Sequence, residues 1–185
     1  ITSYQNVPLA EINGFEIEYE QVFEAIMDSP NDLLVKFNYT ETESEVIVNP
    51  GDTYINSIGT VVDAQNLLAN GRDTRLQGQS DTIANFQIGL DNLQNQTQAT
   101  LIVNYVSDRV RARGIDVLPD IIEEPPLLVD FAFSKIYSYP EFELKLSLEL
   151  RNLLDEEYYA SMRNIAIYDQ YDLGTSASLG FKISF

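Results

Sequence analysis

Hydrophobic and polar residues alternate with a period of two in seven separate segments of the chain. The clearest is 142–151, where an apolar residue at every even position alternates with Glu143, Lys145, Ser147, Glu149 and Arg151. The last twelve residues, 174–185, repeat the pattern and end on an aromatic residue. Because successive side chains of a β-strand point to opposite faces, each segment predicts a strand with one apolar and one polar face.

The connections between these strands alternate in length. Short turns follow the first, third and fifth strands, whereas long segments rich in turn-forming and polar residues follow the second, fourth and sixth. We expect the long segments to be loops, at about 46–78, 110–126 and 152–173. The seven predicted strands are 14–24, 33–40, 81–91, 97–109, 127–137, 142–151 and 174–185.

Strand length and connection length together indicate a membrane protein. Strands of roughly 9 to 11 residues span a bilayer when tilted, and outer-membrane barrels alternate short periplasmic turns with long extracellular loops. Aromatic residues near strand ends suit the girdles of such barrels; they are Tyr39, Tyr105, Tyr137, Tyr139 and Phe185. We therefore predict an all-β fold, an antiparallel transmembrane β-barrel segment. A soluble β-sandwich shares the alternation, but three loops of this length are uncommon in a compact domain.

Seven strands do not close a barrel of this type, because single-chain bacterial barrels have an even number of strands from eight upward. An open sheet would leave backbone groups unpaired in lipid. We therefore expect the chain to be part of a longer protein with further strands upstream, and the first thirteen residues to end an extracellular loop.

Composition narrows the possible functions. The net charge of -18 and the absence of a basic face argue against binding nucleic acid. The chain has no histidine and no cysteine, so the usual serine or cysteine triads and thiolate metal sites are excluded. We expect no enzyme activity, no cofactor and no metal site.

Several segments resemble the carboxy-terminal part of the barrel of TonB-dependent outer-membrane receptors. The motif NLLDEEYY at 152–159 precedes a polar, aromatic segment and a terminal phenylalanine, and four further segments occur in the order of that family: 14–21, 38–45, 78–85 and 104–114. The resemblance covers nearly the whole chain, 1–185.

This resemblance implies a barrel of roughly 22 strands in the bacterial outer membrane, with an amino-terminal plug domain that this chain does not contain. It implies uptake of an iron chelate, cobalamin or an oligosaccharide, with energy from TonB, which would contact the missing amino-terminal region. Expected partners are outer-membrane lipid, lipopolysaccharide and the barrel-assembly machinery. A passive porin remains an alternative.

Two sets of residues are candidate functional sites. The last long segment carries an aromatic and charged set suited to stacking on sugars or holding a metal chelate, although loop packing or lipid-headgroup contact would use the same residues: Tyr158, Tyr159, Arg163, Tyr168, Asp169 and Tyr171. The carboxy-terminus is similar to the assembly signal of outer-membrane proteins, carried by Phe185, Ile183 and Phe181.

Three charged groups have competing interpretations. An acidic group could hold Ca²⁺, although a solvated acidic loop is favoured; it comprises Asp116, Asp120, Glu123 and Glu124. An arginine group could meet lipopolysaccharide phosphates or form salt bridges at the barrel rim; it comprises Arg109, Arg111 and Arg113. Glu16, Glu18 and Glu20 would repel one another, and Lys36 on the next strand or residues of a plug domain could compensate.

Overall fold

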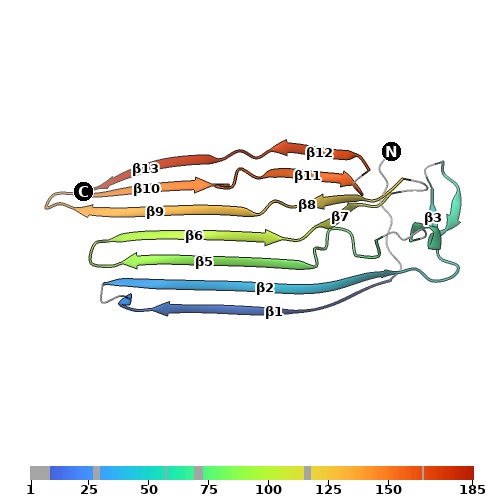
Figure 1. Ribbon diagram of the computed structural model, residues 1–185, viewed down its shortest axis with the longest axis horizontal. Helices are drawn as coiled ribbons and strands as arrows, with labels where there is room; N and C mark the ends of the chain where they lie inside the picture. Colours follow the sequence, from blue (N-terminus) through green and yellow to red (C-terminus); the bar gives the residue numbers. More distant parts are fainter. Residues whose placement is uncertain (1–8, 27–29, 57, 69–72, 115–117, 164) are drawn as a thin grey trace.

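A computed structural model describes residues 9–26, 30–56, 58–68, 73–114, 118–163 and 165–185 of this all-β protein (Figure 1). Seven antiparallel strands form the main sheet, each paired with the next along the chain. They are β1 (Leu9–Phe23), β2 (Asn31–Ile47), β5 (Thr82–Asn92), β6 (Thr97–Val106), β9 (Leu128–Ser138), β10 (Glu143–Arg151) and β13 (Ser176–Ser184). The prediction of seven antiparallel strands in these places is confirmed.

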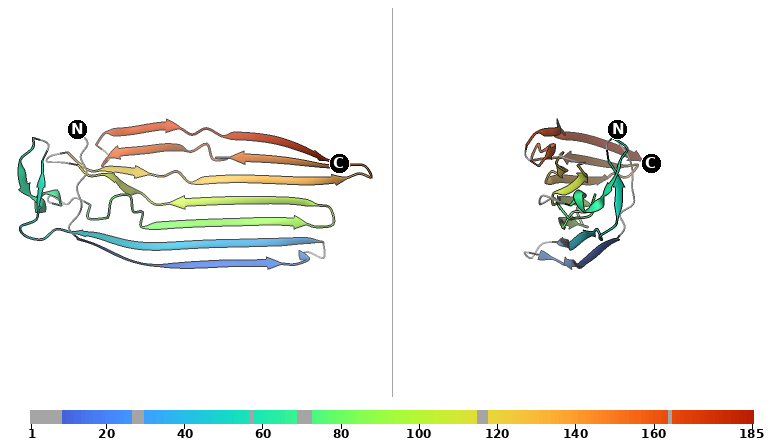
Figure 2. Two further views of the ribbon diagram at one scale, coloured as in Figure 1. Left: turned by 180° about the vertical axis from the view of Figure 1, so that it is seen from behind. Right: turned by 90° about the vertical axis from the view of Figure 1, so that its right-hand side faces the viewer.

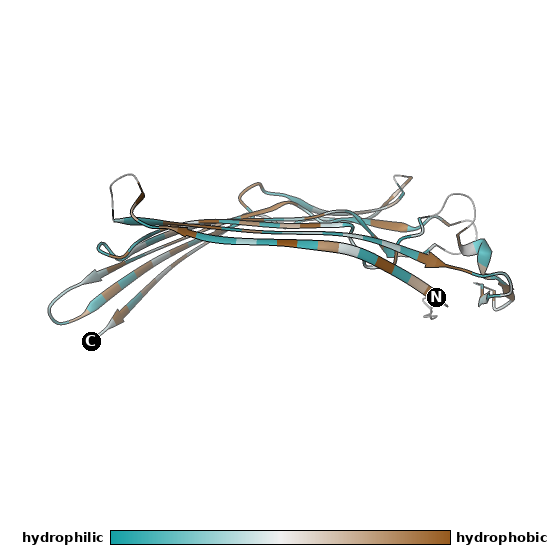
Figure 3. Ribbon diagram, turned by 90° about the horizontal axis from the view of Figure 1, so that it is seen from below, coloured by the Kyte–Doolittle hydropathy of each residue, from teal (hydrophilic) through white to brown (hydrophobic). Residues whose placement is uncertain are grey.

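The apolar residues of all seven strands lie on one side of this sheet. One row of directly opposed residues runs from β1 to β9 through Tyr19, Phe37, Phe86, Val103 and Val129. A second row, on β5, β6, β9, β10 and β13, consists of Leu90, Ala99, Phe133, Leu148 and Leu179. Figure 3 shows the alternation of hydrophobic and hydrophilic residues along the strands. We call this the apolar side; the opposite, polar side carries the intervening residues.

Hydrogen-bonding side chains line up across the polar side. Glu18, Asn38, Asn85 and Asn104 stand directly opposite one another on four adjacent strands. Asn85 Nδ2 donates to Asn38 Oδ1 at 3.5 Å. Lys36 Nζ lies 2.9 Å from a Glu20 carboxylate oxygen, so the expected compensation of acidic charge on β1 is confirmed for Glu20.

The three long connections are not simply loops, and that prediction is wrong. The first contains β3 (Thr53–Ile55), β4 (Val61–Asp63) and a 3-10 turn, η2 (Ala64–Leu67). The others contain β7 (Arg109–Ala112), β8 (Ile121–Glu124), β11 (Glu157–Met162) and β12 (Ile167–Asp172). The sequence did not reveal these strands because several of them carry polar residues on both faces, so the contrast that marks a half-buried strand is weak.

β7, β8, β11 and β12 form a second, small sheet in the order β12-β11-β8-β7. Each of its strands lies in line with a strand of the main sheet: β7 prolongs β6, β8 precedes β9, β11 prolongs β10 and β12 precedes β13 (Figure 1). The small sheet therefore extends the main sheet at its loop end, opposite the turn end where the short turns lie. β1 and β2 also run further than predicted: residues 9–13, expected in a loop, pair with β2.

Asn152 holds the chain together where β10 gives way to β11. Its side chain is buried and its backbone has a φ of 52°. The side-chain amide donates to the carbonyl oxygens of Glu156 and Gly174 at 3.1 and 3.2 Å and accepts from the Glu156 amide at 3.0 Å. Thr175 Oγ1 donates to the Asn152 carbonyl oxygen at 2.9 Å. The first residue of the NLLDEEYY motif thus ties β10, β11 and β13 together.

Segment 73–81 fills the gap between β2 and β7 at the loop end. The Val46 amide donates to the Thr74 carbonyl oxygen at 2.7 Å on one flank. On the other flank the Gly78 amide donates to the carbonyl oxygen of Val110 at 2.8 Å. Because Val110 is fully buried, this segment completes the best-packed part of the molecule.

The sheet edges and the helix content complete the description of the fold. In the described part of the chain, β1 and β13 each pair with a strand on one side only, and they lie at opposite ends of the twisted sheet (Figure 2). Helical structure in the same residues is short, and none of it has the length and apolar character needed to cross a membrane.

Candidate functional site

Residues from three strands of the small sheet gather around Arg111. Arg111 Nη1 donates to the Tyr158 hydroxyl oxygen at 2.8 Å and to Asp169 Oδ2 at 3.2 Å. The guanidinium carbon lies 5.7 Å from the ring centroid of Tyr158 and 5.4 Å from that of Tyr168. The Tyr158 and Tyr171 rings stack with centroids 4.7 Å apart. We call these five residues the Arg111 cluster.

Two β-bulges make this arrangement possible. Arg111 lies at a register shift between β7 and β8, since Val110 pairs with Ile122 and Ala112 with Ile121. Tyr168 lies at a similar shift on β12, between two residues that pair with Ala160 and Ser161. A bulge re-aims a side chain, and this explains why the consecutive residues Tyr168 and Asp169 both contact Arg111.

A second ion pair adjoins the cluster and sets its electrostatics. Arg109 Nε lies 2.8 Å from Glu123 Oε2. The hydrogen bond from Arg109 holds the pKa of Glu123 below its usual value. Burial, followed by the charge of Glu123, raises the pKa of Tyr158, and the hydrogen bond to Asp169 raises the pKa of Arg111. The two arginines are therefore charged and the tyrosine is neutral near pH 7.

The side of the sheet on which the cluster lies follows from an unbroken strand register. The Ser107 amide donates to the Thr82 carbonyl oxygen at 2.9 Å, and Ser80 pairs with Arg109. This continues the β5–β6 pairing, in which Ala84 stands opposite Tyr105. Side chains alternate along a strand, so Arg109 lies on the same side as Tyr105, the apolar side.

A series of directly paired residues places Asp169 and Tyr158 on the apolar side as well. Glu123 stands opposite Arg109, Ala160 opposite Glu123, and Asp169 opposite Ala160. Tyr158 is two residues from Ala160 on the same strand and therefore shares its side. The Arg111 cluster thus continues the apolar side beyond its last apolar residues.

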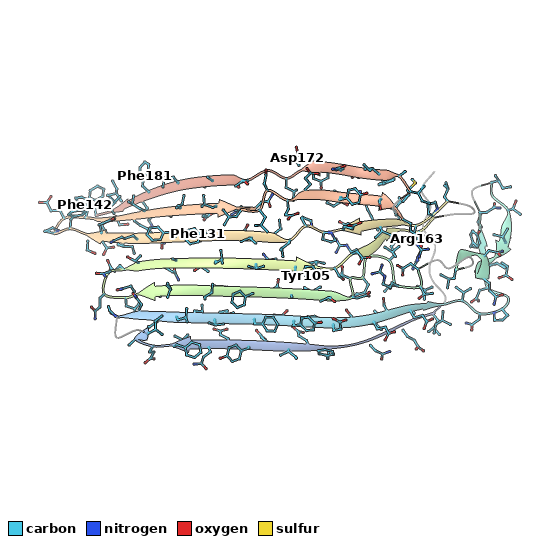
Figure 4. All side chains as sticks on the ribbon, in the orientation of Figure 1. Tyr105, Phe131, Phe142, Arg163, Asp172 and Phe181 are labelled. Carbon is cyan, nitrogen blue, oxygen red and sulfur yellow. The ribbon has the colours of Figure 1, made fainter. Side chains whose placement is uncertain are left out.

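The structure brings together four of the six residues predicted as a ligand-binding set: Tyr158, Tyr168, Asp169 and Tyr171. Tyr159 follows Tyr158 on β11 and therefore points to the polar side. Arg163 directly follows β11, at the loop end of the small sheet (Figure 4), with a φ of 44°. The sequence did not associate Arg111 with this set, because 47 residues separate it from Tyr158.

A separate charged network lies on the polar side at the loop end. Arg75 makes ion pairs with three carboxylates, at 2.7 Å to Asp73, 3.2 Å to Asp81 and 2.9 Å to Asp108. Burial raises the pKa of Asp73, but its hydrogen bonds with Arg75 outweigh that effect and leave the pKa lowered. Arg113 donates to the main-chain carbonyl oxygens of Asp73 and Arg75. These contacts anchor segment 73–81 and were not predicted from the sequence.

The prediction that the acidic group is a solvated loop is wrong for Asp120 and Glu123, whereas Glu124, at the end of β8, is exposed. Asp120 is completely buried, 3.1 Å from Arg113 Nη1 and 2.9 Å from the Gly114 amide, and Glu123 pairs with Arg109. Asp116 lies outside the described residues. Each of the three arginines of the basic group has a carboxylate partner. Among the residues that the structure describes, no three potential ligands are placed to hold a metal ion.

The carboxy-terminal residues proposed as an assembly signal lie at the turn end. Phe181 and Ile183, on the apolar side of the edge strand β13, stand opposite Leu146 and Leu144. The Phe185 side chain is fully exposed, with its ring centroid 6.5 Å from that of Phe142. Figure 4 shows Phe142 and Phe181 close to this end of the sheet.

A shallow depression of about 230 Å³ is lined by residues of β1, β2, β5 and β6, among them the polar Glu18, Lys36 and Asn85 and the apolar Ile102. Its amides and charges can hydrogen-bond to a polar molecule on that side of the sheet.

No protein-family model, curated protein or solved structure matches the chain. The chemistry of the Arg111 cluster is therefore argued from its geometry. A guanidinium presents donors that match phosphate and carboxylate oxygens, and tyrosine rings combine an apolar face with a polar tip that suits a boundary between water and an apolar phase.

Proposed function

We propose that this chain forms part of a β-barrel in the bacterial outer membrane, and that the barrel imports a scarce nutrient with energy delivered by TonB. The continuous, exposed apolar side of the main sheet carries the membrane part of the proposal. Leu179 and Phe181 are 78% and 77% exposed, and their neighbours on the adjacent strands extend the same surface. An exposed apolar surface that runs across all seven strands is unfavourable in water, whereas lipid chains would cover it.

The dimensions of the apolar side suit a bilayer. Thr97 and Tyr105 lie on the apolar side near the two ends of β6, eight residues apart, which corresponds to about 27 Å along the strand at a rise of 3.4 Å per residue. At a strand tilt of about 35–45° this spans roughly 20 Å of membrane, close to the apolar band of about 25 Å in outer-membrane barrels. A β-sandwich of this strand length would instead need a second sheet on the apolar side, and the described residues form none there.

The open edges support a closed barrel with additional strands. Among the described strands, β1 and β13 each pair on one side only and leave a row of backbone donors and acceptors, which lipid cannot satisfy. Further strands that pair with both edges would close the sheet, and the polar side would then face the interior.

The transport part of the proposal rests on the resemblance to TonB-dependent receptors and on the polar side itself. Asn38, Asn85 and Asn104 offer donors and acceptors to a polar molecule or to a plug domain. The ligand classes proposed are an iron chelate, cobalamin or an oligosaccharide. A passive porin is the competing function.

Cysteine labelling tests the membrane orientation, because this chain has no cysteine of its own. Leu146→Cys places a thiol on the apolar side and Ser147→Cys places one on the polar side. In cells that produce the protein, Leu146→Cys should react with a lipid-soluble maleimide and resist a charged, water-soluble one. Ser147→Cys is the matched control and should react with the water-soluble reagent. Equal reaction of both variants with the water-soluble reagent in intact, folded protein would overturn the proposal.

Uptake measurements separate a TonB-dependent receptor from a porin. A strain in which the gene is disrupted should lose high-affinity uptake of one of three probes: a ferric hydroxamate, cobalamin or maltoheptaose. In the parent strain a protonophore should abolish the same uptake, since TonB draws on the proton gradient. Uptake that is unaffected by the protonophore would identify a passive pore.

A further inference from the structure

We propose that the Arg111 cluster binds a phosphate group of lipopolysaccharide in the outer leaflet of the membrane. This inference rests on the proposed function, because it requires the apolar side to face lipid. It assigns to Tyr158, Tyr168, Asp169 and Tyr171 a contact with the surrounding membrane and not with the transported ligand.

The position of the cluster suits a headgroup. Arg109 and Arg111 lie four and six residues beyond Tyr105, or about 14 and 20 Å further along the strand at 3.4 Å per residue. The strand register places Arg109 on the apolar side, and Arg111, at the bulge, contacts Tyr158 and Asp169 on that side. At a strand tilt of about 35–45°, these positions lie roughly 10 to 15 Å beyond the hydrocarbon, where lipid-facing groups would meet phosphates and sugars of the outer leaflet and not the barrel interior.

Basic side chains on the apolar side occur at its two rims. Arg109 and Arg111 are at the loop end, and Lys135 is at the turn end, 5.1 Å from the Tyr137 ring centroid. Cationic and aromatic residues at both boundaries of an apolar band are the arrangement that membrane interfaces favour. The Arg111 cluster is the more elaborate of the two, with three tyrosines.

The guanidinium of Arg111 is held in place, and two of its nitrogens make no hydrogen bond with a described residue. Its hydrogen bonds with described residues use Nη1 alone, and its side chain is 37% exposed. The rings of Tyr158 and Tyr168 flank it, which reduces the freedom that a bound phosphate would otherwise have to restrict. Nε and Nη2 can donate to two oxygens of one phosphate in the paired geometry typical of arginine.

Because Asp169 offsets the charge of Arg111, this site does not attract anions by positive charge alone. Its contact with Arg111 is 3.2 Å long and its side chain is 40% exposed. The carboxylate keeps the cluster close to neutral, so affinity depends on placing a phosphate against Nε and Nη2 of Arg111 and not on excess positive charge. A uniformly anionic surface should therefore bind less well than a lipid whose phosphate sits among sugars that can stack on the tyrosines.

Site-specific crosslinking tests the proposal. Tyr168 is replaced by the photoreactive residue benzoylphenylalanine in the protein produced in its outer membrane, and Tyr159, on the polar side, is replaced in the same way as a control. Irradiation should give a lipopolysaccharide adduct at position 168 at least five-fold stronger than at position 159. Adding Arg111→Gln should reduce the adduct several-fold, while Arg151→Gln, an exposed arginine on the polar side, should leave it unchanged.

A second arm identifies the phosphate. The purified protein is reconstituted with lipopolysaccharide or with the same lipid after removal of its phosphates, and the adduct should fall several-fold with the second lipid. Equal adducts with both lipids, or an adduct that survives Arg111→Gln in folded protein, would overturn the phosphate site. Loss of the adduct while Leu146→Cys still labels from lipid would refute this inference alone, whereas loss of lipid labelling at Leu146 would refute the proposed function itself.

Discussion

Asn152 Nδ2 donates a hydrogen bond to the carbonyl oxygen of Gly174, 3.2 Å away, across the point where β10 and β13 leave the main sheet. The same buried side chain also bonds twice to Glu156. One residue therefore fixes the junction between the two sheets, and a substitution there should destabilise both sheets.

Asn152→Ala should destabilise the folded protein by about 2–4 kcal/mol. The substitution leaves buried backbone groups without partners, at about 1–3 kcal/mol, and places a non-glycine residue without a polar side chain at a positive φ, at roughly 1 kcal/mol more. Urea unfolding in detergent micelles measures the change. Asn95→Ala, at an exposed turn position, is the control and should change the unfolding free energy by less than about 0.5 kcal/mol.

Gly14→Ala should weaken the pairing of β1 with β2. A methyl group at this position would lie 2.4 Å from the carbonyl oxygen of Glu41 and 2.6 Å from a side-chain carbon of Thr42. The strand must shift to accommodate it, at about 1–3 kcal/mol. Hydrogen exchange of β1 and β2 amides should accelerate while β9 and β10 stay protected.

Gly89→Ala provides the matched comparison, because Gly89 also lies on a strand and on the polar side. Its nearest neighbour to an added methyl group is the Thr100 hydroxyl, at an ordinary 3.5 Å. Its exchange pattern should match that of the unaltered protein. Equal acceleration in the two variants would contradict the close approach at Gly14.

The pair of Arg109 and Glu123 should make the loop end sensitive to acid. The pKa of Glu123 is lowered by the hydrogen bond from Arg109, so the pair contributes stability above the unfolded pKa of about 4.3. That contribution is lost as the pH falls through the lower folded pKa. Thermal unfolding from pH 6 to pH 3 should show a stability decrease that Glu123→Gln reduces. Glu149→Gln, which alters an exposed pair with Arg151, should keep the decrease.

Removal of Phe185 should impair assembly in the outer membrane. The ring is fully exposed and continues the apolar residues Phe181 and Ile183 of the edge strand, so an assembly factor could bind it. The folded fraction is the share of protein that keeps its folded mobility in a denaturing gel when the sample is not heated. This fraction should fall several-fold without Phe185, and Phe185→Tyr should restore most of it. Undiminished assembly of the shortened protein would count against the signal.

The sequence by itself determined the main sheet. In β10, the alternation of Leu144, Leu146 and Leu148 with charged residues specifies both a strand and the side that each residue occupies, because the side-chain period of a strand is two. Short turns then place three pairs of strands side by side: β1 with β2, β5 with β6, and β9 with β10. The pairing of strands across the three long connections does not follow from these local signals.

Only the tertiary structure decided the loop end. The strands β7 and β12 lack a clear alternation, and the bulges at Arg111 and Tyr168 change the direction of side chains by one residue, which no periodicity reveals. The partners of Arg111 are 47 and 58 residues away along the chain. Asn152 likewise gains its role from Gly174, on a strand that the chain reaches much later. Pattern predicts where a strand runs and which way it faces while the period is regular, but bulges and contacts between distant segments depend on the register of the assembled sheet.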